Sequence, residues 1–154
     1  TTPINSGTAT SGGIAVNTNR RLTPKLYLNA DITLQAMQAP DLDRAGTQSL
    51  TSVSGSLGFG YTISAKDSLN FNVNSTGKRL TGQGYISSYA FDSLLYSHRL
   101  SPKLQLNLRV TNLLRMTKMS FVIDSTMLRS VSMTSPQSQT LLISLSRSFG
   151  GFSK

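Results

Sequence analysis

Few side chains in this sequence could perform catalysis. His98 is the only histidine, cysteine and glutamate are both missing from the 154 residues, and all 6 acidic residues are aspartates. General acid–base catalysis and metal binding both need such groups to converge on one point. The aspartates are instead spread along the whole chain, at Asp31, Asp41, Asp43, Asp67, Asp92 and Asp124. We therefore expect no enzyme active site and no cofactor.

Two positions come closest to such chemistry, and each has an ordinary structural explanation. His98 precedes Arg99 at the end of an expected strand, where an interfacial polar residue is favoured over a general base. Asp41 and Asp43 could contact Ca²⁺ from a loop, but a solvated loop explains the pair equally well. With no thiol and a single imidazole, the sequence predicts no metal centre.

The net charge of +9 narrows the choice of partners. Nucleic-acid binding needs cations clustered on one surface. The 15 basic residues are dispersed, mostly singly, and aromatic residues are not interleaved with them. We therefore expect no nucleic-acid partner. The same charge attracts the phosphates of lipid head groups and lipopolysaccharide, so these are the expected partners.

Alternation with a period of two residues is the clearest structural signal. Between Lys103 and Thr111, leucine or valine alternates with polar residues, and residues 141–149 repeat the pattern. Such alternation predicts strands with one apolar face and one polar face. Weaker versions predict further strands at residues 12–20, 25–38, 53–61, 69–73 and 85–99. In residues 85–99 the phase is ambiguous, because Leu94 and Leu95 are adjacent.

The connections between these strands alternate in length. Short turns are expected near residues 23, 66 and 101, and two of them contain a proline that favours a tight reversal. Longer polar segments are expected at residues 38–48, 76–88 and 112–139, with an eighth strand as an alternative inside residues 120–133. A chain that passes up and down through a slab produces this alternation of short turns and long loops.

These features predict an all-β fold: an antiparallel up-and-down meander of seven or eight strands. Residues 1–11 are expected to be a polar loop or frayed terminus, residues 12–149 the strands, and residues 150–154 a tail. No apolar run reaches the roughly 18 to 20 residues of a spanning helix, so a bilayer would be crossed by strands. Seven strands leave two unpaired edges, which hydrocarbon does not tolerate. The meander is therefore expected to be part of a larger, even-stranded barrel.

Four motifs carry a family resemblance. They are Lys78–Tyr85, Leu106–Leu114, Phe121–Arg129 and Ser148–Gly151. In order and spacing the chain resembles the C-terminal part of the outer-membrane β-barrel of TonB-dependent receptors, although Arg147 stands where that family often has an aromatic residue. The resemblance implies a barrel of about 22 strands, of which this chain is the final third. It also implies a plug domain and TonB as partners, with gating supplied from outside this sequence.

Three groups of residues are candidates for function. Mid-strand polar residues could line a lumen, although Asp31 and Arg109 could equally form inter-strand ion pairs that only fill space. Aromatic residues near the short turns suit an interfacial girdle or ordinary core packing. Basic residues near the long loops could meet lipopolysaccharide phosphates or an anionic ligand, although solvation explains each singly. The groups are Asp31, Gln105, Asn107 and Arg109 for the lumen, Tyr27, Tyr61, Tyr96 and Phe149 for the girdle, and Lys78, Arg79, Arg115, Lys118 and Arg129 for the loops.

The first functional hypothesis is a transport component of the bacterial outer membrane. The strands would wall the uptake path of a nutrient such as a metal chelate or oligosaccharide, and the remainder of the barrel or another chain would close it. A second hypothesis is a self-contained eight-stranded barrel with an adhesin or structural role. A third is a soluble β-sandwich that binds glycans, with its apolar faces buried between two sheets.

Overall fold

The computed structural model describes residues 8–41, 46–135 and 138–149, and every regular element in them is a strand. The strands are β1 (Thr10–Arg21), β2 (Leu26–Pro40), β3 (Thr47–Thr62), β4 (Asp67–Thr76), β5 (Arg79–Thr81), β6 (Gly84–Ile86), β7 (Tyr89–Ser101), β8 (Leu104–Thr111), β9 (Met119–Asp124), β10 (Arg129–Thr134) and β11 (Thr140–Arg147). Within these ranges the chain has no helix that could cross a membrane. The prediction of an all-β fold is confirmed.

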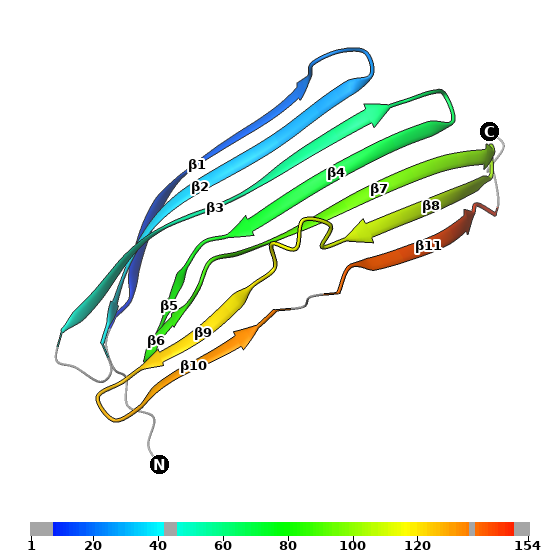
Figure 1. Cartoon of the computed structure of the whole chain (residues 1–154). Helices are drawn as coiled ribbons and strands as arrows, with labels where there is room; N and C mark the ends of the chain where they lie inside the picture. The colour runs from blue at the N-terminus through cyan, green and yellow to red at the C-terminus, as the bar shows by residue number, and fades with distance from the viewer. Residues whose placement is uncertain (1–7, 42–45, 136–137, 150–154) are drawn as a thin grey trace.

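Seven of the strands form one antiparallel sheet, the first sheet, in the order β1-β2-β3-β4-β7-β8-β11 (Figure 1). The short turns β1–β2, β3–β4 and β7–β8 all lie at one end, termed here the short-turn side. The opposite end, termed the long-loop side, carries the remaining connections. The three short turns lie where the sequence predicted them, and the predicted long connections after β4 and β8 contain the remaining strands.

The three short turns share one device. Thr23, Ser64 and Ser101 each begin a turn, and each side-chain hydroxyl accepts a hydrogen bond from the backbone N–H of the lysine two residues later, at 3.2, 3.0 and 3.3 Å. Serine and threonine hydroxyls stabilise turns in this way because they replace a backbone acceptor. The repeated Ser/Thr-x-Lys pattern thus reverses the chain and leaves a lysine at each reversal.

The remaining four strands form a second sheet on the long-loop side, in the order β10-β9-β6-β5. The strand expected inside residues 120–133 belongs here, as β9 and β10, and adds no eighth strand to the first sheet. The single strand expected at residues 85–99 is wrong, because the chain leaves the second sheet at Ser87 before β7 begins. Ser87 exchanges hydrogen bonds with Ser120 in both directions, each 2.8 Å long.

Several expected boundaries also differ from the structure. Both ends of the long polar segment predicted at residues 38–48 are strand, because β2 reaches Pro40 and β3 begins at Thr47. The polar side chains at these ends suggested a loop, but the backbone pairing of β2 with β3 continues through them. The first strand begins at Thr10 rather than residue 12, and the last ends at Arg147. The expected tail at residues 150–154 and most of the expected initial loop lie outside the described residues.

The register places apolar residues opposite each other across most of the first sheet. Leu28, Phe59, Phe71, Leu94 and Val110 follow one another on neighbouring strands. Directly opposed residues share a face, so this row belongs to one apolar face. Leu95 pairs instead with asparagine and arginine and lies on the opposite, polar face. The structure thus settles the phase of the two adjacent leucines.

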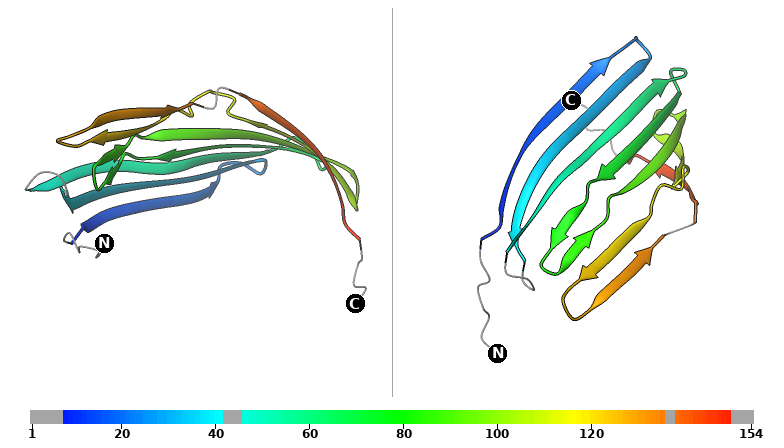
Figure 2. Two further views of the ribbon diagram at one scale, coloured as in Figure 1. Left: turned by 90° about the horizontal axis from the view of Figure 1, so that it is seen from below. Right: turned by 60° about the vertical axis from the view of Figure 1, so that its left-hand side comes forward.

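The apolar face of the first sheet is not covered by any described element. Ile14 is 70% exposed and Leu141 is 62% exposed. The buried hydrophobic residue among those described is Val122, which belongs to the second sheet. Figure 2 shows the first sheet as one curved layer with no second layer packed against it. This arrangement excludes the two-layer sandwich, since its apolar faces would be buried against each other.

A buried carboxylate anchors the chain where it leaves β8. Asp92 is 2% exposed, and its side-chain oxygens accept the backbone N–H groups of Leu113 at 2.8 Å and Leu114 at 3.2 Å. Asn112 begins this turn with a φ of 57°, a left-handed conformation that asparagine tolerates better than most residues. Asp92 thereby satisfies two backbone donors that the turn removes from the sheet.

We expect Asp92→Leu to lower the free energy of unfolding by about 1–3 kcal/mol, because two backbone donors lose their acceptor. Asp92→Asn keeps one acceptor oxygen and should cost less. Urea unfolding of the folded protein, followed by circular dichroism, measures both values. Equal stability of Asp92→Leu and the unmodified chain would contradict this role for the carboxylate.

Candidate functional site

The polar face of the first sheet is built mainly from asparagine, serine, threonine and glycine. Asn29 and Asn72 flank Gly58 on the neighbouring strands. A Cβ atom at Gly58 would meet the Oδ1 atoms of Asn29 and Asn72 at 1.9 and 2.6 Å, so their amides occupy the space above this glycine. Glycine at this position therefore leaves room for these two side chains. The surface around Gly58 therefore consists of uncharged hydrogen-bonding groups.

The predicted lumen residues all lie on this polar face. Gln105 donates to Asn107 Oδ1 at 2.7 Å, and the Ser97 hydroxyl donates to the same atom at 2.8 Å. Asp31 accepts a hydrogen bond from the Ser56 hydroxyl on β3. Asp31 on β2 and Arg109 on β8 are separated by three intervening strands, so they do not pair with each other.

Two further arginines lie on the polar face, and the sequence reasoning did not select them. Arg21 is opposite Tyr27, and Arg99 is opposite Gln105. Continuing the alternation of β1 by one residue beyond Arg20 would have placed Arg21 on this face. Arg99 was harder to assign, because the phase of its strand was ambiguous.

The predicted aromatic residues divide between the two faces. Tyr61 and Tyr96 share a row on the apolar face, with Leu69 between them. Tyr27 lies on the polar face, where its hydroxyl donates to Asn19 Oδ1 at 3.0 Å. Phe149 lies just beyond β11, and the guanidinium of Arg147 stands over its ring at 4.9 Å. Only Tyr61 and Tyr96 of the three tyrosines could therefore contact an apolar environment on the outside of the sheet.

A small polar cluster lies at the short-turn end of the apolar face. Asp67 accepts the Tyr96 hydroxyl at 2.6 Å and the Ser64 hydroxyl, and His98 Nδ1 lies 2.6 Å from the same carboxylate. His98 therefore belongs to an ordinary structural cluster at the end of a strand. No group of three His, Cys, Asp or Glu side chains that could hold a metal occurs in residues 8–41, 46–135 and 138–149. Asp43 of the considered Ca²⁺ pair lies outside these ranges.

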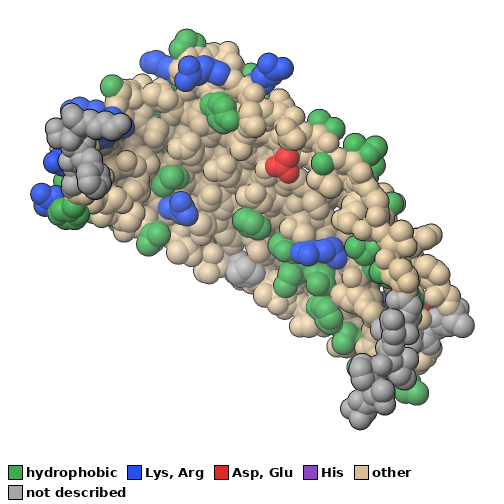
Figure 3. Space-filling model, turned by 180° about the vertical axis from the view of Figure 1, so that it is seen from behind, with side chains coloured by type: hydrophobic (Ala, Val, Ile, Leu, Met, Phe, Trp, Pro, Cys, Tyr) green, Lys and Arg blue, Asp and Glu red, His purple; other side chains and the backbone are tan. Residues whose placement is uncertain are grey.

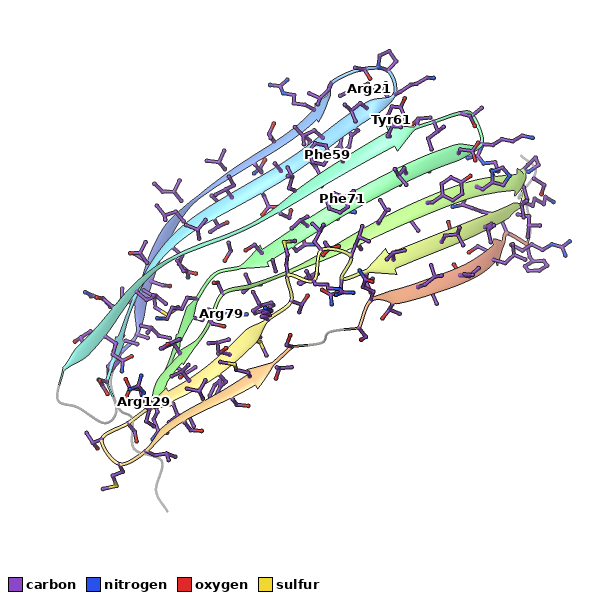
Figure 4. The ribbon with its side chains drawn as sticks, in the orientation of Figure 1. Arg21, Phe59, Tyr61, Phe71, Arg79 and Arg129 are labelled. Atoms are coloured by element: carbon purple, nitrogen blue, oxygen red, sulfur yellow. The ribbon has the colours of Figure 1, made fainter. Side chains whose placement is uncertain are left out.

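The predicted basic loop residues gather in or beside the second sheet. Lys78 precedes β5, and its Nζ atom lies 3.5 Å from the centre of the Tyr85 ring. Arg79 begins β5 and Arg129 begins β10, as Figure 4 shows at the end remote from Arg21. Arg115 and Lys118 lie between β8 and β9. All five thus lie on the long-loop side.

The apolar band runs obliquely across the first sheet. It centres between Ile14 and Val16 on β1, but at Ile143 on β11. Following the paired residues strand by strand from Ile143 leads to Leu26 on β2 and then to Leu22, just beyond β1. The band therefore shifts by about seven residues over six strand steps, about 23 Å along the strands and about 29 Å across them. Strands tilted by about 40° keep such a band level, as in membrane barrels.

These features define a class of protein: a tilted antiparallel wall with an apolar outer band and a polar inner face, as in a transmembrane β-barrel. The chain belongs to the outer membrane protein beta-barrel family, whose model matches residues 1–146. This family places the protein in the bacterial outer membrane. Searches for similar curated proteins and for similar solved structures gave no match.

We expect Leu94→Lys to destabilise the protein in a bilayer by about 2–4 kcal/mol, because it places a charge in the middle of the lipid-facing band. Leu95→Lys is the matched control, since the adjacent, identical side chain lies on the polar face and should cost less than about 1 kcal/mol. Urea unfolding in lipid vesicles compares the two. Equal costs would show that the two faces are not differently solvated.

Proposed function

We propose that this chain forms the C-terminal strands of a TonB-dependent receptor barrel and walls the uptake path of a nutrient. The observation that carries the proposal is the pairing of the first sheet. Its strands all pair antiparallel, and β1 and β11 each have one edge with no partner among the described residues. Free strand edges are not stable in hydrocarbon, so further strands are needed to close the wall.

The direction of the edge strands supports closure by additional strands. Six antiparallel steps separate β1 from β11, so these two strands run in the same direction. Direct pairing of the two edges would create one parallel junction in an otherwise antiparallel sheet. An odd number of added strands restores antiparallel pairing throughout and gives the even total that is usual for bacterial single-chain barrels.

The size of the polar side chains supports a wide barrel. Barrels of about eight strands are filled by their own inward side chains. Here the polar face is rich in small residues, including Ser54, Ser56, Gly58, Gly60 and Ser144. These side chains would leave the interior of a narrow barrel unfilled. They suit a wall whose lumen is occupied by water, a solute or a plug domain.

The partners follow from the same arrangement. The apolar band would contact outer-membrane lipid, and the basic residues of the long-loop side would meet lipopolysaccharide phosphates. The plug domain and TonB are proposed as partners on the basis of the family resemblance alone. In this proposal the chain contributes geometry and polar contacts, and it performs no catalysis.

We expect the chain expressed alone to give no compact, heat-modifiable band on a gel, whereas the whole protein that contains it should give one. A closed barrel resists detergent until it is boiled and then migrates differently. An open wall with two free edges lacks this resistance. A compact unboiled band from the chain alone would favour the small self-contained barrel instead.

Disulfide trapping gives an independent measurement, since the chain has no native cysteine. The pair Asn19→Cys and Asn29→Cys should cross-link under oxidation, because these residues are directly opposed on β1 and β2. Cysteines placed at Asn17 or Asn19 of β1 together with Ser144 or Ser146 of β11 should not cross-link. Cross-linking of an edge pair within one chain would contradict the proposed wider barrel.

A further inference from the structure

Cations gather on the polar face at the short-turn side, where the proposed function has not used them. Four of them form two pairs, and each pair consists of one lysine from a short turn and one arginine from an adjoining strand. Lys25 and Arg21 form the first pair, and Lys66 and Arg99 form the second. Figure 3 views this face and shows Lys and Arg side chains gathered at its upper left, which is the short-turn side. These four residues are termed the cation cluster.

The first cation pair lines a hollow of about 170 Å³. The register sets Gly60 between Tyr27 and Asn70 on the neighbouring strands. Because glycine has no side chain, a space remains between the aromatic ring and the amide. Nothing nearer than the Oδ1 atom of Asn70, at 3.1 Å, would meet a Cβ atom at Gly60. The hollow therefore offers room, an apolar ring and hydrogen-bonding groups beside two positive charges.

The second cation pair lines an adjoining hollow of about 230 Å³. Ser97 and Gln105 also line it, and both donate hydrogen bonds to Asn107 Oδ1. Thr62 and Ser68 line both hollows, so the two lie side by side along the short-turn side. The residues that line the two hollows thus include many with hydroxyl or amide side chains. Each hollow also has one lysine and one arginine.

The acidic groups near the cation cluster are already engaged. Asp67 lines the second hollow, but its carboxylate contacts Ser64, Tyr96 and His98. Asp31 lies four residues farther along β2 than Tyr27 and accepts the Ser56 hydroxyl. The four positive charges therefore exceed the negative charge around the two hollows. An anion would be attracted to this part of the face.

We propose that the two hollows bind a small solute that carries a carboxylate or phosphate together with several hydroxyl groups, such as a sugar acid or sugar phosphate. Arginine binds such oxyanions through paired N–H groups, and lysine adds a point charge. The serine, threonine, asparagine and glutamine side chains supply partners for the hydroxyl groups, and the Tyr27 ring supplies a flat apolar surface. The inference rests on the proposed function and names the class of solute that moves along the wall.

Isothermal titration calorimetry of the whole detergent-solubilised protein tests this inference, with glucose 6-phosphate, gluconate and glucose as probes. We expect the two anions to bind and glucose to bind at least about tenfold more weakly, because it lacks the charged group. The double variant Arg21→Gln with Arg99→Gln should weaken anion binding by about tenfold or more. Raising the salt concentration should also weaken it, since the cations are exposed.

Arg20→Gln is the matched control. Arg20 adjoins Arg21 in β1 but lies on the apolar face, opposite Leu28. We expect this variant to bind both anions as the unmodified protein does. Equal loss in Arg20→Gln and Arg21→Gln would overturn the site, because the effect would then reflect net charge alone. Equal binding of glucose and glucose 6-phosphate would overturn the proposed solute class.

A further probe separates a small solute from a macromolecular partner. Binding of a peptide rich in Asp and Glu, with no binding of the sugar anions, would overturn the inference and assign the cation cluster to a protein partner. The test also remains distinct from that of the proposed function. Cross-linking between β1 and β11 would contradict the wide barrel, but anion binding could still be measured. Failure to bind the anions would contradict the solute site and would not bear on how the barrel closes.

Discussion

The need to pair every backbone hydrogen-bonding group inside a bilayer governs this structure. In hydrocarbon an unpaired N–H or C=O group has no water to bind, so only a continuous ladder between strands is stable. Antiparallel pairing supplies that ladder from β1 to β11. Because the side chains of a strand alternate between its two faces, the same ladder sorts them into an apolar band and a polar face. The geometry of the sheet is therefore the geometry that a membrane β-barrel of this family requires.

Charge placement follows from this sorting. On the apolar face, Arg20, His98 and Arg147 lie toward the short-turn side, where long or polar side chains can reach the head groups. Asp92 is the exception farther along the face, and it is covered by the turn whose backbone N–H groups it accepts. On the polar face the cations can contact water directly. In the described part of the first sheet, these charged residues are thus hydrated, hydrogen-bonded or near an interface.

The sequence predicted those parts of the fold that local alternation controls. Leu104, Leu106 and Leu108 alternate with polar residues without interruption, so their strand and its faces were evident. Leu94 and Leu95 break the alternation, and only their partners across the sheet decide which of them faces outward. For the same reason the burial of Asp92 could not be predicted, since it depends on a turn about twenty residues later. The cation cluster likewise depends on neighbours in space, because Arg21 and Arg99 are far apart in the chain.

Single-cysteine labelling along β4 tests most directly whether this register separates lipid from water. These 154 residues have no native cysteine, so each variant adds one reactive thiol to them. With the whole protein in the outer membrane, a water-soluble maleimide should label cysteines at Asn70 and Asn72 and spare those at Leu69 and Phe71. Equal labelling at adjacent positions, or labelling of the leucine and phenylalanine positions alone, would contradict the account.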